Sequence, residues 1–161
     1  MGLKNLIGQG ANYTPAYQTS GTPYVTSSAA TGRQEGPSIV NFPYVTKTIT
    51  VRNLGSVDLR VAFTLSGSYA VGETIGMTGG VKPATDPRAS NYQGNNFFVL
   101  PAESADAAPS QVTLDARCKQ LFLMAAHNTN DTEYSLYAGL TGISTDQFPV
   151  LSASNGFLGV G

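Results

Sequence analysis

The stretch TKTITVRNLGSVDLRVAFTL, residues 46–65, constrains the fold more than any other part of the sequence. In each half, apolar residues recur at alternate positions. They are Val45, Ile49 and Val51 in the first half, with Lys47 as the exception, and Leu59, Val61, Phe63 and Leu65 in the second. A period of two is typical of strands with one buried face. Asn53, Gly55 and Ser56 supply turn chemistry between the halves. The stretch therefore predicts two consecutive antiparallel strands of an all-β domain.

Similar short runs occupy the rest of the chain. With the two above they give eight predicted strands, at 38–42, 45–53, 58–65, 96–100, 111–117, 120–125, 132–140 and 147–151. The runs at 96–100 (NFFVL) and 120–125 (QLFLMA) are nearly all apolar, as expected for strands that are covered on both faces. No amphipathic helical pattern is evident, so the sequence predicts an antiparallel sandwich or barrel.

The alternation also predicts which side chains form the core, because a shift of one residue would expose the whole set. The predicted core includes Ile49, Val51, Leu59, Val61, Phe63, Phe98, Leu100, Leu114, Leu121, Leu123 and Leu136.

Two segments lie outside the strand pattern. Residues 1–35 contain Gly, Ser, Thr, Tyr and Pro without a periodic apolar face, so we expect an extended N-terminal arm that becomes ordered against a neighbour, or else a flexible terminus. Residues 66–95 are rich in glycine and are predicted to form a surface insertion between the third and fourth of these strands. The remainder, 36–161, is assigned to one domain.

The low charge of the chain limits the classes of partner. Charged residues make up 12% of the sequence, against about 25% in an average globular protein. Nine basic and ten acidic residues give a net charge of −1, so no basic field exists to bind nucleic acid. A charge near zero favours self-association. No apolar run approaches the roughly 20 residues of a membrane span, and we expect neither a nucleic-acid partner nor a span.

The residues that most often carry catalysis are scarce in this sequence. His127 is the only histidine and lies in AAHNTND, which is typical of a turn; this excludes a multi-histidine metal centre. Cys118 is the only cysteine, and we interpret it as a small packed residue rather than a reactive thiol. We therefore expect no enzyme activity and no catalytic residues.

Two further patterns suggest ligands only weakly. The glycines before Lys82 do not have the spacing of a phosphate-binding loop, because Pro83 follows the lysine. Asp131, Glu133 and Asp146 suggest a calcium site, but acidic residues at strand ends normally face water. We expect no cofactor and no metal.

Four segments in chain order carry a resemblance to a known family: TKTITVRNLGSVDLRVAF, NNFFVLPAESAD, LDARCKQLFLMA and TEYSLYAGLTGI. The pattern V-R-N-x-G…L-R-V-x-F is matched by Val51, Arg52, Asn53, Gly55, Leu59, Arg60, Val61 and Phe63. Two later motifs are matched by Phe98, Leu100, Glu103 and Ser104, and by Tyr134, Ser135, Ala138, Gly139, Leu140 and Thr141. These segments resemble the single jelly-roll penton proteins at the five-fold vertices of large icosahedral DNA viruses of the nucleocytoplasmic group.

The resemblance covers about residues 45–143, apart from the insertion. It implies an eight-stranded single jelly roll with the arm and the insertion added. It also implies a homopentamer at the capsid vertex of the virion, in contact with major and minor capsid proteins. Two alternatives stay open: a glycan-binding jelly-roll lectin, and a phage decoration protein or fibre head.

Overall fold

The chain forms an all-β structure in the computed structural model, which describes residues 22–74, 95–103, 110–152, 155–157 and 159–160. The strands are β1 Thr22–Ala30, β2 Ser38–Asn41, β3 Tyr44–Asn53, β4 Leu59–Ala62, β5 Phe97–Leu100, β6 Gln111–Leu114, β7 Gln120–Ala125 and β8 Thr132–Ser144. Two 3₁₀ turns accompany them, η1 Ser66–Ser68 and η2 Thr145–Gln147.

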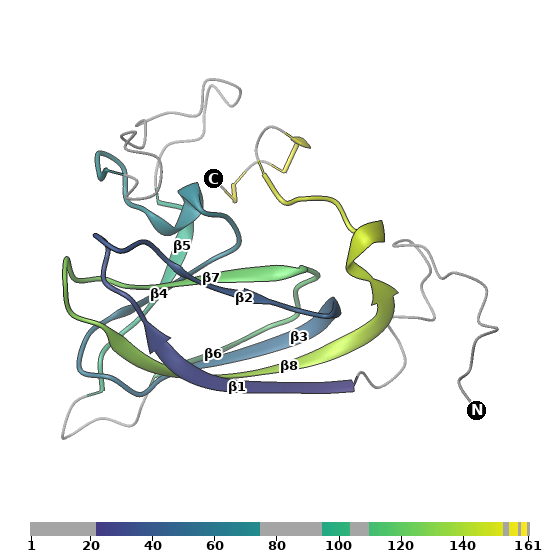
Figure 1. Ribbon diagram of the computed structural model, residues 1–161, viewed down its shortest axis with the longest axis horizontal. Helices are drawn as coiled ribbons and strands as arrows, with labels where there is room; N and C mark the ends of the chain where they lie inside the picture. The colour runs from purple at the N-terminus through teal and green to yellow at the C-terminus, as the bar shows by residue number, and fades with distance from the viewer. Residues whose placement is uncertain (1–21, 75–94, 104–109, 153–154, 158, 161) are drawn as a thin grey trace.

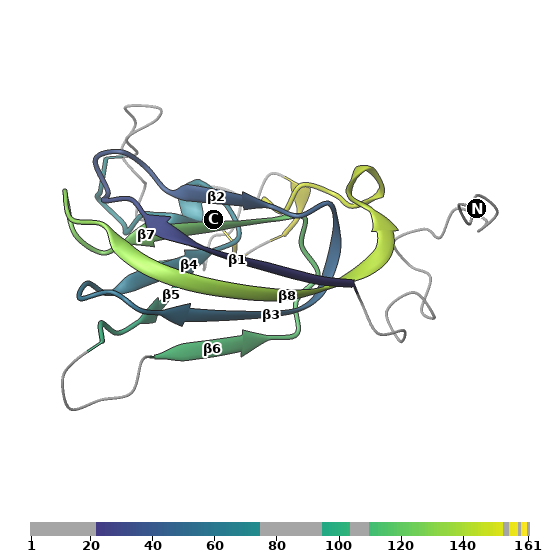
Figure 2. The ribbon, with the colours of Figure 1, turned by 60° about the horizontal axis from the view of Figure 1, so that its bottom comes forward.

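The strands pair into two antiparallel four-stranded sheets that pack face to face (Figures 1 and 2). The first sheet has the order β1-β8-β3-β6, and the second has the order β2-β7-β4-β5. From β1 to β4, each successive strand lies in the other sheet, and the same holds from β5 to β8. This arrangement of eight strands in two sheets is the jelly roll. The predicted fold class is confirmed.

The core lies between the two sheets and contains most of the predicted residues. Eight of them are buried: Ile49, Val51, Leu59, Val61, Leu100, Leu121, Leu123 and Leu136. The prediction is wrong for Phe98, which is 50% exposed. Phe98 faces the same side as Val61, its partner across the sheet, but β5 is an edge strand, and the core covers Leu100 at its end without reaching Phe98. Phe63 and Leu114 are half-buried, because Phe63 follows the end of β4 and Leu114 ends the edge strand β6.

The interior strands of the second sheet, β4 and β7, are covered on both faces. In β7 the side chains of Phe122 and Met124, which face away from the core, are as buried as those that face it, as the sequence predicts for 120–125. The C-terminal segment runs beside this outer face after β8 (Figure 1). It is attached there by Lys119 Nζ, which donates to the Phe148 carbonyl at 3.1 Å, and by Asn96 Nδ2, which donates to the Gly159 carbonyl at 3.1 Å. The prediction of a strand at 147–151 is wrong, because residues 148–151 have no strand structure. They belong instead to the C-terminal segment beside the second sheet.

The domain boundary differs from the predicted one, because Thr22–Ala30 of the predicted arm form β1. This strand pairs with β8 along its whole length, from Thr22 opposite Leu140 to Ala30 opposite Thr132. The Tyr24 ring contacts Phe42 edge to face, with centroids 5.3 Å apart. Small polar residues on the exposed face of β1 conceal its alternation in the sequence. The arm prediction now concerns residues 1–21, which lie outside the described residues.

The insertion also differs from its prediction. Because β1 precedes the other strands, the insertion lies between the fourth and fifth strands. Its first residues do not project from the surface: Gly67, Ser68 and Tyr69 are buried against the fold. Residues 75–94 lie outside the described residues.

Two N-terminal deletions test the new boundary. Deleting residues 1–30 removes β1, and we expect the chain to lose cooperative folding, because a core-covering strand contributes much of the roughly 5 to 15 kcal/mol that stabilises a domain. Deleting residues 1–21 leaves every described strand and should change the melting temperature little. Circular dichroism and thermal melting measure both. A stably folded 1–30 deletion would contradict the placement of β1.

Candidate functional site

The amide of Asn53 organises the turn of the V-R-N-x-G motif. Asn53 ends β3 and is fully buried. Its Nδ2 atom donates to the carbonyls of Val57, Leu100 and Pro101 at 2.9–3.0 Å. The last two carbonyls lie at the end of β5 in the second sheet, so the amide connects the two sheets at one end of the sandwich.

The carbonyl oxygen of the same amide is also satisfied. Asn53 Oδ1 accepts hydrogen bonds from the Gly55 N–H at 3.1 Å and from Thr132 Oγ1 at 3.0 Å. A Cβ atom on Gly55 would approach the Glu133 backbone nitrogen to 2.7 Å and would collide with the Thr132 hydroxyl. This position therefore requires glycine, so that the turn can pack closely against the start of β8. The role of the motif is structural.

An ion cluster attaches the segment after β4 to the outer face of the second sheet. Arg60 of β4 forms a bidentate pair with Glu73, with N–O distances of 2.6 and 3.0 Å. The Ala70 N–H donates to the same carboxylate at 2.7 Å, and Arg33 from the β1–β2 loop pairs with it as well. The Arg60 guanidinium lies 4.5 Å from the centroid of the Phe97 ring in β5. The cluster joins three segments that are distant in sequence.

The electrostatics of the cluster favour the ionised carboxylate. Burial by itself raises the pKa of the Glu73 carboxyl. The hydrogen bonds from Arg60, the Ala70 N–H and Arg33 outweigh burial and lower this pKa from 4.5 to about 2. Glu73 therefore remains charged at neutral pH and compensates the buried guanidinium of Arg60, which would be costly to bury alone.

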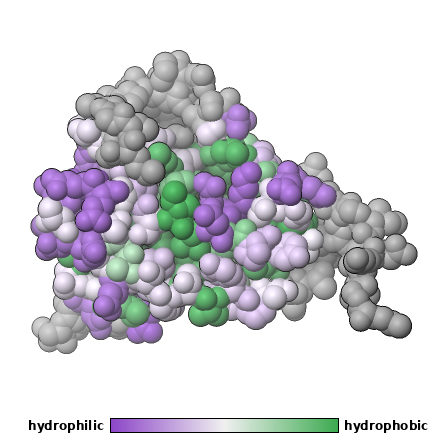
Figure 3. Space-filling view, in the orientation of Figure 1, coloured by the Kyte–Doolittle hydropathy of each residue, from purple (hydrophilic) through white to green (hydrophobic). Residues whose placement is uncertain are grey.

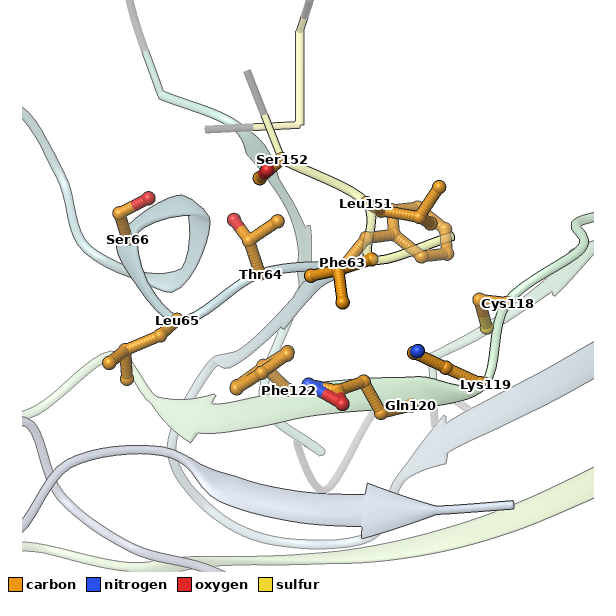
Figure 4. Close-up of a pocket in the computed structure, with 11 residues that line it drawn as sticks. Phe63, Thr64, Leu65, Ser66, Cys118, Lys119, Gln120, Phe122, Leu151 and Ser152 are labelled. Atoms are coloured by element: carbon orange, nitrogen blue, oxygen red, sulfur yellow. The ribbon is translucent and has the colours of Figure 1, made fainter. Parts of the chain in front are cut away.

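A groove of about 400 Å³ lies between the second sheet and the C-terminal segment (Figure 4). Residues from three segments line it: 63–66 after β4, 118–122 around the start of β7, and 150–152. Phe63, Phe122 and Leu151 are among its apolar side chains, and Ser66 and Gln120 are among its polar ones. Hydrophobic residues gather near the middle of the same face between hydrophilic ones (Figure 3). The groove is suited to burying an apolar group.

Cys118 and His127, the two single residues considered for catalysis, both make hydrogen bonds within the fold. Cys118 is fully buried, and burial raises the pKa of its thiol to about 11, although hydrogen bonds, including one with Thr46, act in the opposite direction. The thiol is therefore protonated at neutral pH. His127 is exposed in the β7–β8 turn, where its Nδ1 accepts hydrogen bonds from the backbone of Thr129 at 3.3 Å and Asn130 at 3.1 Å.

The acidic residues that suggested a calcium site do not meet. Asp131 precedes β8 and accepts a hydrogen bond from the Gly32 N–H at 3.1 Å, whereas Asp146 follows the other end of β8. A strand of 13 residues separates them, which corresponds to about 40 Å. Within the described ranges, no group of three or more His, Cys, Asp and Glu residues is placed to hold a metal. Lys82 lies outside the described residues.

Comparison with known proteins gives no match: no protein-family model, no curated protein sequence and no solved structure is significantly similar to this chain. In the part of the chain that the structure describes, no helix has both the length and the apolar character needed to span a membrane.

Replacement of Asn53 tests the role of the motif turn. Asn53→Ala removes a hydrogen-bond partner from three carbonyls, including the buried one of Leu100, and from an N–H and a hydroxyl. We therefore expect the free energy of unfolding to fall by about 3 kcal/mol. Chemical denaturation measures the change. Asn130→Ala, at an exposed turn position, is the matched control and should stay within about 0.5 kcal/mol of the wild type. Equal effects of the two substitutions would contradict the framework role of Asn53.

The pH dependence of stability tests the ion cluster. Because the pKa of Glu73 is lower in the folded chain than the usual 4.5, its stabilising effect is complete above about pH 4.5 and disappears as the pH falls towards 2. Glu73→Gln should therefore be less stable than the wild type at pH 7, and the difference should shrink below pH 4.5. Urea denaturation from pH 2 to 7 measures this. Glu103→Gln, at an exposed position, controls for the loss of one negative charge. If the stability difference between Glu73→Gln and the wild type does not vary with pH, the charge of Glu73 does not stabilise the ion cluster.

Proposed function

We propose that this chain is a structural capsid subunit, a penton that closes the five-fold vertices of an icosahedral virus particle. It acts by forming a homopentamer and by contacting the neighbouring major and minor capsid proteins. The observation that carries the proposal is the relation between motif and fold. The residues that resemble the penton family build the framework of a jelly roll: Val51, Leu59 and Val61 lie in its core, and Asn53 with Gly55 joins its sheets.

The use of charge supports an assembly function. With charged residues at 12% of the sequence, large surfaces can associate without desolvating many ions. Arg60 and Arg33 both pair with Glu73 in the ion cluster, so three of the few charged side chains contact one another. A ring of five identical chains then needs one interface between unlike surfaces, repeated until it closes.

A binding module is the second candidate, and the groove beside β7 favours it. The lining of the groove includes Phe63, Leu65, Phe122 and Leu151, which suits an apolar ligand better than a polar glycan. A lectin would bind glycans as an isolated protein, and a phage decoration protein would form trimers. Binding to a glycan array would favour the lectin over the penton.

Native mass spectrometry of the purified full-length protein tests the proposal. We expect a complex of five times the 16.8 kDa chain mass. The complex should withstand moderate salt, because apolar rather than ionic contacts hold it together. The matched control is the same sample in mild denaturant, which should give the single chain. A complex of three chains would indicate a trimeric decoration protein, and a monomer at all concentrations would contradict the penton.

A further inference from the structure

The edge strands of both sheets carry no charged side chains. Within the described residues, the edge strands are β1 and β6 in the first sheet and β2 and β5 in the second. None of these four strands contains Asp, Glu, Lys or Arg. Charged residues are found instead in the interior strands β3, β4 and β8. Proteins usually place charges on edge strands, because an edge exposes backbone N–H and C=O groups that can pair with another chain.

The same edges also expose large apolar side chains. On β1 and β2, which we call the β1/β2 flank, Val25 is 68% exposed and Ile39 is 44% exposed. On β5 and β6, the β5/β6 flank, Phe98 is 50% exposed and Val99 is 47% exposed. The strand order places the two flanks on opposite sides of the sandwich (Figure 2). Each molecule thus has two uncharged sides that point away from each other, and each side exposes two large apolar side chains among small or polar ones.

We propose that the β5/β6 flank of one copy binds the β1/β2 flank of a second copy of this chain. This inference rests on the proposed function and names the surfaces that the ring uses. The contact joins unlike surfaces, so each subunit keeps one flank available for the next neighbour. Repetition of this contact leaves no flank exposed when the ring closes.

The character of the flanks favours a second copy over a different partner. A charged partner would leave its own ions without counter-charges, because neither flank carries any. A different protein bound to one flank would leave the opposite apolar flank in water on every subunit. A copy of the same chain supplies both flanks in equal number, and the near-zero net charge of −1 opposes such contact little.

Lysine substitutions on either flank test the interface by native mass spectrometry. Phe98→Lys on β5 and Ile39→Lys on β2 should each reduce the population of the ring about ten-fold or more, because a charge buried at the contact has no partner. Tyr44→Lys is the matched control: Tyr44 is 46% exposed, but it begins the interior strand β3. The control should keep the ring. Circular dichroism shows whether each variant is folded.

Mixing the two flank variants distinguishes unlike from like contacts. The Phe98→Lys chain keeps an intact β1/β2 flank, and the Ile39→Lys chain keeps an intact β5/β6 flank. One contact can form between them but cannot be repeated, so the mixture should give a complex of two chains. If only one of the two substitutions removes the ring, the flank binds itself, and the inference is wrong.

Cross-linking provides a second test, which does not require a lysine at the contact. Val99→Cys and Ile39→Cys chains, mixed and treated with a short bis-maleimide, should give cross-linked dimers, whereas Val99→Cys alone should not. The native Cys118 is buried and does not compete.

The outcomes separate this inference from the proposed function. A pentamer that persists in both lysine variants, with no cross-link, overturns the flank contact and leaves the penton proposal standing. A ring with another number of copies that both lysine variants abolish supports the flank contact and overturns the penton. A wild-type chain that stays monomeric and gives no cross-link overturns both.

Discussion

The buried amide of Asn53 is the interaction on which the rest of the sandwich depends. A jelly roll must hold two sheets together at an end where the chain passes repeatedly between them, and backbone groups in those connections need partners away from water. One side chain meets this need here, because its N–H groups reach the end of β5 and its oxygen binds the turn that leads to β4. The Thr132 hydroxyl lies 3.0 Å from Asn53 Oδ1 and 2.8 Å from the Val57 carbonyl oxygen and shares its one proton between them, which brings in the start of β8. The motif around Asn53 therefore joins the ends of three strands, β3, β5 and β8.

The parts of this fold that the sequence predicts are those in which burial follows the strand period. In β3 and β4, one face meets the core, so Ile49, Val51, Leu59 and Val61 are recognisable as a set. The strand β1 is not predicted, because an edge strand with one open face needs few apolar residues. Of its side chains that face inward, only Tyr24 and Ala30 are not small polar groups. The opposite error occurs at β5. Its run FFVL has the composition of a strand covered on both faces, yet Phe98 and Val99 are about half exposed. The composition of a strand does not show whether its faces are covered by the same chain or by another chain.

The candidate sites were less predictable than the fold, because they depend on contacts between distant segments. Glu73 lies 13 residues from Arg60 and 40 from Arg33, in a segment with no strand pattern, so nothing in the sequence pairs them. The groove likewise forms only because residues 150–152 return over the start of β7. The absence of catalytic residues remains a prediction for the chain as a whole. For Cys118, however, the burial that raises its pKa agrees with the sequence-based interpretation of a packed residue.

The distribution of charge connects the stability of the single chain with its proposed assembly. Arg60 and Glu73 are placed on the outer face of the second sheet, where they attach the segment after β4 and cover a surface that would otherwise be open to partners. The edge strands, where a soluble monomer would place such charges, have none. Charges on edge strands are one of several ways in which proteins avoid uncontrolled pairing of strands, and this chain does not use that one. In the proposed ring, each flank would be covered by a flank of the next subunit, which would prevent such pairing without adding a charge.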